Sequence, residues 1–102
     1  MPPTSGNSGL APEAGARFLL ELDSAGDAAS AAYRVAIYTP GEVYEGTATL
    51  DDEGGVTLAI DAPAPLVERL EMFAKLTARA AGKRREDGLP AWPARVLRWR
   101  PD

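Results

Sequence analysis

The spacing of apolar residues changes once along this chain, and that change sets the fold class. From residue 17 to residue 60, apolar residues recur at about every second position, the period of a half-buried β-strand. From residue 66 to residue 82 they recur at every third or fourth position, the period of an amphipathic helix. The chain is therefore predicted to form a sheet first, and then a helix that covers the one apolar face of that sheet.

Four segments have the strand pattern, and they cover residues 17–23, 32–39, 43–50 and 56–60. Only Leu19 breaks the alternation in the first of them. Residues 24–31 are small and polar and are predicted to form a loop, while Pro40 and Gly41 suit the central positions of a type II turn. Strands joined by such short links pair in sequence order, so we predict a four-stranded antiparallel meander.

The helix is predicted to cover residues 66–82. Pro65 suits its first turn and Gly82 its C-terminal end, after which residues 83–88 are expected to form a solvated turn. The predicted apolar stripe and the positions beside it are Leu66, Val67, Leu70, Phe73, Ala74, Thr77 and Ala81.

At 102 residues the chain has the length of one domain. Residues 1–15 are rich in Pro, Gly and Ser and hold almost no large apolar residue, so we predict a disordered tail followed by a single α+β domain over residues 16–102. The sequence shows neither a secretory signal pattern nor an apolar run of membrane-spanning length, and the cytoplasm is the expected location.

The composition removes most enzyme chemistry. There is no His and no Cys, which excludes Ser-His-Asp and Cys-His arrangements, imidazole or thiolate metal sites, and disulfides. The acidic run at residues 51–53 lies in a predicted turn, without a desolvated pocket and without the spacing of a calcium loop. We therefore expect a non-enzymatic protein with no catalytic residue, no cofactor and no metal site.

Charge is divided unevenly along the chain. Residues 1–61 carry two basic and ten acidic side chains, and residues 62–102 carry nine basic and five acidic ones. Such a division either holds the two halves of the fold together or indicates an acidic or polyanionic partner.

Both tryptophans and three arginines lie in the last residues. Read as a helix, residues 93–100 would form two turns between prolines; we favour a short edge strand that pairs with the sheet, with the tryptophans packed against the helix and the arginine stems over them. Trp99 is expected to belong to the core. For Trp92, held between prolines, the surface and the interior both remain open.

Trp, Tyr and Arg are the residue types that most often carry the energy of protein interfaces. We therefore predict a small protein-interaction (adaptor or binding) domain that makes its contact mainly through the C-terminal Trp/Arg segment. A sheet with a Thr-, Ala- and Tyr-containing outer face and an open edge also favours pairing with a second copy, giving a homodimer. The predicted partner-binding residues are Tyr38, Arg84, Arg85, Trp92, Arg95, Arg98, Trp99 and Arg100.

Single-stranded nucleic acid is the alternative partner, because arginines hold phosphates and tryptophans stack on bases. The predicted order of elements is similar to that of several folds, including single-stranded nucleic-acid binders of the PUR type, in architecture and without a matching motif. The net charge of -4 and the acidic residues along the strands oppose a phosphate backbone. A protein partner is therefore the favoured prediction.

Overall fold

The computed structural model describes residues 14–27 and 29–101. Within these residues the elements are β1 (Ala16–Asp27), β2 (Ser30–Tyr38), β3 (Val43–Asp51), β4 (Val56–Ile60), α1 (Ala64–Glu86) and β5 (Arg95–Arg100). The predicted α+β class, with a four-stranded meander, one long helix and a short C-terminal strand, is confirmed. The predicted tail at residues 1–15 lies almost wholly outside the described residues.

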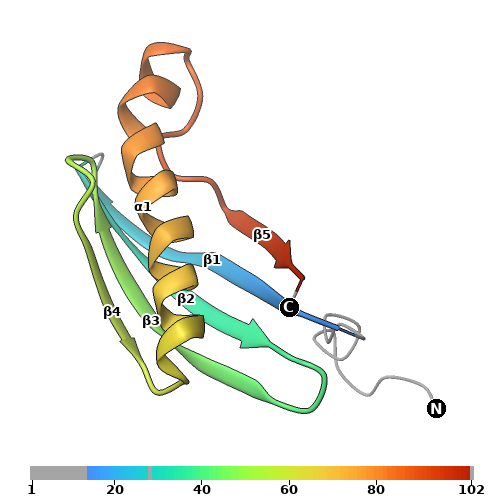
Figure 1. Ribbon diagram of the computed structural model, residues 1–102. Helices are drawn as coiled ribbons and strands as arrows, with labels where there is room; N and C mark the ends of the chain where they lie inside the picture. Colours follow the sequence, from blue (N-terminus) through green and yellow to red (C-terminus); the bar gives the residue numbers. More distant parts are fainter. Residues whose placement is uncertain (1–13, 28, 102) are drawn as a thin grey trace.

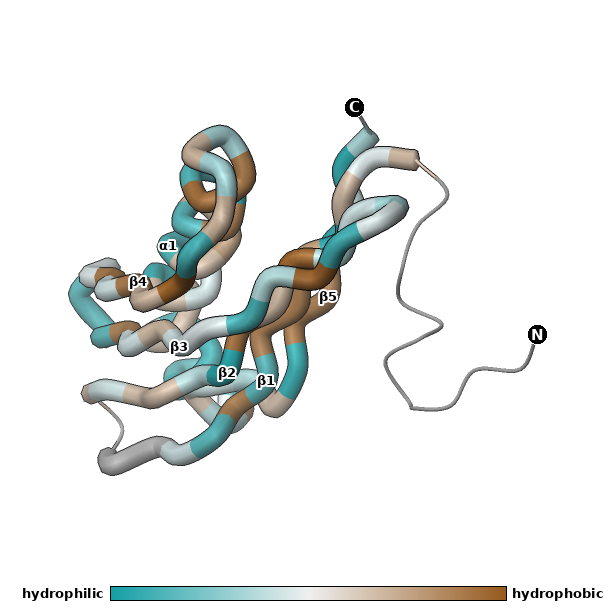
Figure 2. The backbone as a smooth tube through the Cα atoms, turned by 90° about the horizontal axis from the view of Figure 1, so that it is seen from below, coloured by the Kyte–Doolittle hydropathy of each residue, from teal (hydrophilic) through white to brown (hydrophobic). Residues whose placement is uncertain are grey.

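The strands form one antiparallel sheet in the order β4-β3-β2-β1-β5. The chain returns from the end of α1 to place β5 beside β1, at the side of the sheet opposite β4 (Figure 1). α1 crosses one face of the sheet and packs mainly over β3 and β4. In a view at right angles, α1 lies on the side of β4, and β5 lies on the opposite side of the sheet, next to β1 (Figure 2).

The main core lies between α1 and the sheet. Phe18 and Leu20 of β1, Ile37 of β2 and Leu50 of β3 are fully buried there because alternate residues of each strand face the helix. The Phe18 and Phe73 rings meet with centroids 5.3 Å apart in a tilted arrangement. The predicted helical stripe is largely confirmed, since the buried residues of α1 are Leu70, Phe73, Ala74, Thr77, Ala78 and Ala81.

The prediction of a loop at residues 24–31 was wrong. β1 continues to Asp27 and β2 begins at Ser30, with register shifts after Leu22 and Ser24. The residues of this segment are small, so the sequence shows no alternation of apolar and polar side chains that would predict a strand. Their backbones can nevertheless pair as two antiparallel strands with an irregular register.

The helix continues through Gly82 and ends at Glu86, so the prediction that it ends at Gly82 was wrong. Gly88 has a φ of 79° and its N–H donates to the Arg85 carbonyl, while the Leu89 N–H donates to the Arg84 carbonyl. These two hydrogen bonds are the Schellman motif, which places the left-handed residue just beyond the helix. Much of the predicted turn at residues 83–88 is therefore helix.

The two predicted turns between strands differ in outcome. Gly41 does not take the positive φ of a type II turn; instead the Thr39 N–H donates to the Glu42 carbonyl at 2.9 Å. The turn at residues 51–55 is present, and its Asp51 carboxylate accepts the N–H groups of Glu53 and Gly55, both at 2.9 Å. In the described ranges no three acidic side chains gather where they could hold a metal ion.

Among the residues that the structure describes, no helix has both the length and the apolar character needed to cross a membrane.

Candidate interaction surface

The register between β5 and β1 divides the C-terminal side chains between the two faces of the sheet. Val96, Arg98 and Arg100 lie opposite residues of β1 that face the helix, including Leu20 and Phe18. The other three residues lie on the outer face, where Arg95 is opposite Glu21, Leu97 opposite Leu19, and Trp99 opposite Arg17. The arginines of this strand are thus split between the two faces.

The two tryptophans lie in opposite environments. Trp92 is 5% exposed and belongs to the core, whereas Trp99 is 51% exposed on the outer face. The expectation that Trp99 is a core residue was wrong, because β5 pairs with β1 in the register that turns Trp99 away from the helix. Trp92 precedes β5, so the alternation of side chains along that strand does not determine where the Trp92 side chain points.

The connection from α1 to β5 is held at several points. Arg84 Nε donates to the Pro90 carbonyl at 2.7 Å, and the Tyr33 hydroxyl donates to the Pro93 carbonyl at 2.7 Å. The Leu22 N–H then donates to the Ala94 carbonyl at 2.8 Å. Because these bonds come from the helix and from two strands, the start of β5 is fixed against both layers of the fold.

The other end of β5 is close to the start of β1. The Trp99 Nε1–H donates to the Ala14 carbonyl at 3.1 Å. Gly15 has a φ of 74°, and a side chain at that position would collide with the Arg100 carbonyl. Glycine here lets the chain enter β1 directly beside the last residue of β5.

An apolar strip crosses the outer face from β5 toward β2. Leu19, Ala36 and Tyr38 are buried and contact one another, and the partly buried Leu97 packs against them. Leu19 is the residue that breaks the alternation of its strand, and this break was the signal in the sequence for the second apolar cluster. Trp99 extends the strip to the edge of the sheet, since Trp99, Arg17 and Tyr38 are successive partners in the register.

Tyr38 lies beneath this surface and is 1% exposed. Its hydroxyl has no hydrogen-bond partner among the described residues. Burial raises the pKa of Tyr38, the nearby Glu45 and Glu21 carboxylates raise it further, and Arg95 lowers it. Tyr38 is therefore buried close to two acidic side chains and one arginine.

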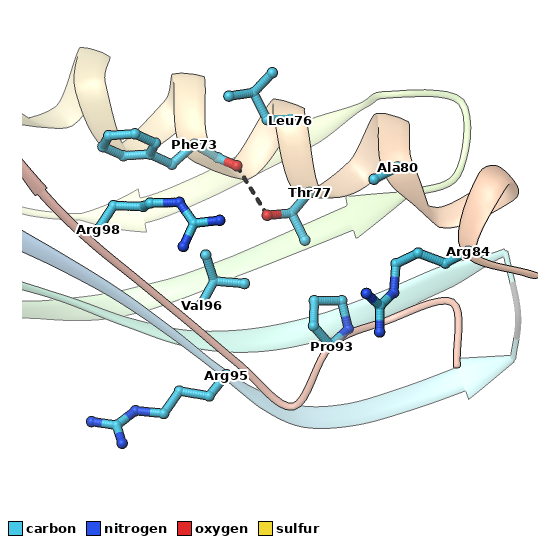
Figure 3. Close-up of a pocket in the computed structure, with 9 residues that line it drawn as sticks. All are labelled: Phe73, Leu76, Thr77, Ala80, Arg84, Pro93, Arg95, Val96 and Arg98. Atoms are coloured by element: carbon cyan, nitrogen blue, oxygen red, sulfur yellow. Dashed lines mark hydrogen bonds between the residues drawn. The ribbon is translucent and has the colours of Figure 1, made fainter. Parts of the chain in front are cut away.

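A cleft of about 330 Å³ separates α1 from β5 (Figure 3). Phe73, Thr77 and Val96 form part of its apolar wall, and the guanidinium groups of Arg84 and Arg98 both lie within it. Arg95 reaches the rim but its side chain points away from the helix (Figure 3). No acidic residue is among those that line the cleft within the described chain.

β5 lies at one edge of the described sheet, and its backbone N–H and C=O groups point alternately toward β1 and away from it. Since the Leu22 N–H pairs with the Ala94 carbonyl, the alternation of an antiparallel ladder turns the N–H and C=O groups of Arg95, Leu97 and Trp99 away from β1. The Leu97 carbonyl accepts a hydrogen bond from Arg98 Nη1 at 2.9 Å. The guanidinium of Arg98 thus caps one of the outward carbonyls.

The structure brings most of the predicted contact residues together. Arg95, Arg98, Trp99 and Arg100 share β5, and Arg84 joins them across the cleft. Arg85 lies elsewhere, since it forms an ion pair with Asp52 at 2.9 Å. Within the described ranges, no ion pair joins Arg84 or an arginine of β5 to a carboxylate.

Comparison of the chain with models of protein families, with curated proteins and with solved structures found no match.

Proposed function

We propose that this chain is a small protein-interaction domain and that β5 is its contact surface. The observation that carries the proposal is the position of Trp99, 51% exposed on an edge strand and flanked by two arginines. Trp and Arg are the residue types most enriched among those that dominate binding energy. A half-exposed Trp costs solvation free energy in the free protein, and a partner that covers it recovers that cost.

The surroundings of Trp99 resemble the centre and rim of a protein interface. Leu97 and the buried Leu19 continue the apolar surface inward from Trp99, and Arg95 lies two residues before Leu97 on the same face. An apolar centre with a charged rim is the usual anatomy of a protein–protein contact.

The charges of the outer face favour a protein over a nucleic acid. Arg98 and Arg100 lie on the helix side, so a phosphate backbone on the outer face would meet only one of the three arginines of β5. That backbone would also approach Glu21 and Glu45, which lie close enough to act on Tyr38. The nucleic-acid alternative is therefore the second outcome of the test below.

Self-association through β5 is the weaker form of the proposal. Two copies meeting at this strand would bring together three arginines from each chain, and like charges across a strand pair are destabilising. The six residues of β5 also provide only a small part of the about 1,200–2,000 Å² that a specific interface buries.

The test is affinity capture from nuclease-treated lysate with the wild-type chain, Trp99→Ala and Val43→Ala. Val43 is a matched control because it is also 51% exposed, lies on the outer face, and follows Trp99, Arg17 and Tyr38 in the same row of strand partners. We expect a protein partner that Trp99→Ala loses and Val43→Ala retains.

Two results would overturn the proposal. The first is capture that both variants retain equally, which would place the contact elsewhere. The second is capture of nucleic acid alone in samples without nuclease, with a steep loss as salt concentration rises. Light scattering on the purified chain measures self-association separately.

A further inference from the structure

β5 offers a partner a backbone edge in addition to its side chains. The N–H and C=O groups of Arg95, Leu97 and Trp99 point away from β1, and no further described strand pairs with them. An edge of this kind is a template on which another extended chain can pair. Pro93 and Pro101 flank the strand, which limits the available ladder to β5 itself.

The edge is partly guarded in the free protein. Arg98 donates from Nη1 to the outward Leu97 carbonyl at 2.9 Å, and a charged side chain on an edge strand is a common device against unwanted pairing. Arg98 also reaches the cleft that contains Arg84 (Figure 3). Two guanidinium groups therefore lie in one cleft whose described lining contains no carboxylate.

We propose that β5 binds an extended, acidic segment of a protein partner by strand addition. In the complex, a partner carboxylate takes the Arg98 guanidinium, and the released Leu97 carbonyl accepts a backbone N–H of the added strand. This inference rests on the proposed function and adds the chemistry of the partner to it. We infer an acidic partner from the positive charge of β5, because carboxylates of the added segment would form ion pairs with the arginines that have none.

The two faces of β5 predict a pattern for the partner segment. On the helix side, an added strand lies beside Val96, Arg98 and Arg100 and close to the mouth of the cleft. On the outer side it lies beside Leu97 and Trp99, with Arg95 at the start of the same row. Since side chains of a strand alternate between faces, the fitting sequence has acidic residues at every second position and apolar residues between them.

A direct probe of this inference is a capped synthetic peptide in which glutamate and valine alternate. It is titrated into the isotope-labelled full chain, and amide resonances are followed by NMR. We expect the largest shifts at residues 95–100, no binding by the matched lysine–valine peptide, and at least about tenfold weaker binding when alternate amides of the acidic peptide are N-methylated, because each methyl removes a ladder donor.

Arg98→Gln is the informative variant of the protein. It keeps a donor near the Leu97 carbonyl but removes the charge, so the acidic peptide is expected to bind about tenfold more weakly. The matched control is Arg79→Gln, because Arg79 lies on α1 against Gly54 of the β3–β4 turn, away from β5. This control should leave the affinity within about twofold.

The outcomes separate the inference from the proposed function. If the peptide leaves residues 95–100 unchanged, or binds equally after N-methylation, strand addition is wrong even when partner capture still depends on Trp99. If the lysine–valine peptide or single-stranded DNA binds β5 as well as the acidic peptide, the assigned partner chemistry is wrong. If capture is also insensitive to Trp99→Ala, the proposed function fails together with the inference.

Discussion

Trp92 and Trp99 lie seven positions apart, yet one is 5% exposed and the other 51% exposed. Trp92 lies in the connection from α1 to β5 and belongs to the core, and the Tyr33 hydroxyl donates to the carbonyl of the neighbouring Pro93. Trp99 lies within β5, on the face that the helix does not cover. The same residue type is therefore part of the core at one position and half exposed on an edge strand at the other.

The difference arises from pairing partners rather than from local sequence. β5 returns to β1, and the register between them decides that Leu97 and Trp99 face outward while Val96 faces the core. Because the side-chain period of a strand is two, a shift of one residue would exchange these roles. The exposure of Trp99 is thus a property of the whole sheet.

The largest effect is expected for Trp92→Ala. Removal of a buried aromatic side chain leaves a cavity, so the free energy of unfolding should fall by about 3–5 kcal/mol. Urea denaturation followed by circular dichroism measures this loss. A loss below about 1 kcal/mol would contradict the assignment of Trp92 to the core.

Tyr33→Phe should have an intermediate effect. The variant removes the hydroxyl that donates to the part-buried Pro93 carbonyl at 2.7 Å, and the loss of one such hydrogen bond costs about 0.5–1.5 kcal/mol. The same denaturation experiment at neutral pH measures it. An unchanged midpoint would show that the connection into β5 is held by its other hydrogen bonds alone.

The pH dependence of stability sharpens the role of Tyr33. Burial raises the pKa of Tyr33 from 10.0 to about 12, although Arg84 acts to lower it. The folded state therefore holds the phenol proton more tightly than the unfolded state, and this contribution is complete below pH 10 and lost as the pH rises toward 12. Wild type should lose more stability than Tyr33→Phe across that interval; parallel curves would contradict the raised pKa.

The smallest effect on stability is expected for Trp99→Ala. Half of this side chain is already in water, so the free energy of unfolding should change by less than about 1 kcal/mol. Partner affinity should fall by about 2 kcal/mol or more if Trp99 is a dominant contact. A variant that unfolds as readily as Trp92→Ala would show that the two tryptophans do not differ in role.

Periodicity was sufficient to predict the elements with clear patterns. β4 was predicted with the observed bounds, and β3 and the helical stripe were close to them, because large apolar residues mark one face of each. The segment at residues 24–31 carried no such mark, and Gly82 could not be distinguished from Gly88 as the end of the helix without the capping hydrogen bonds.

The candidate site could be predicted only in part. The concentration of Trp and Arg near the C-terminus predicted β5 as the candidate surface. Leu19, which breaks the alternation of its strand, was the one sign in the sequence of the apolar strip on the outer face. The cleft between α1 and β5 could not be read from the chain, because it depends on the distance between two elements that pack on different parts of the sheet. The capping of the Leu97 carbonyl by Arg98 likewise depends on which edge of β5 is unpaired.

The most direct test of β5 as the contact surface is amide hydrogen exchange of the full chain with and without its captured partner. The account predicts slower exchange at Arg95, Leu97 and Trp99 in the complex, with β4, at the opposite edge of the sheet, unchanged. Unchanged exchange at β5, with protection at β4 or on the exposed face of α1, would contradict it.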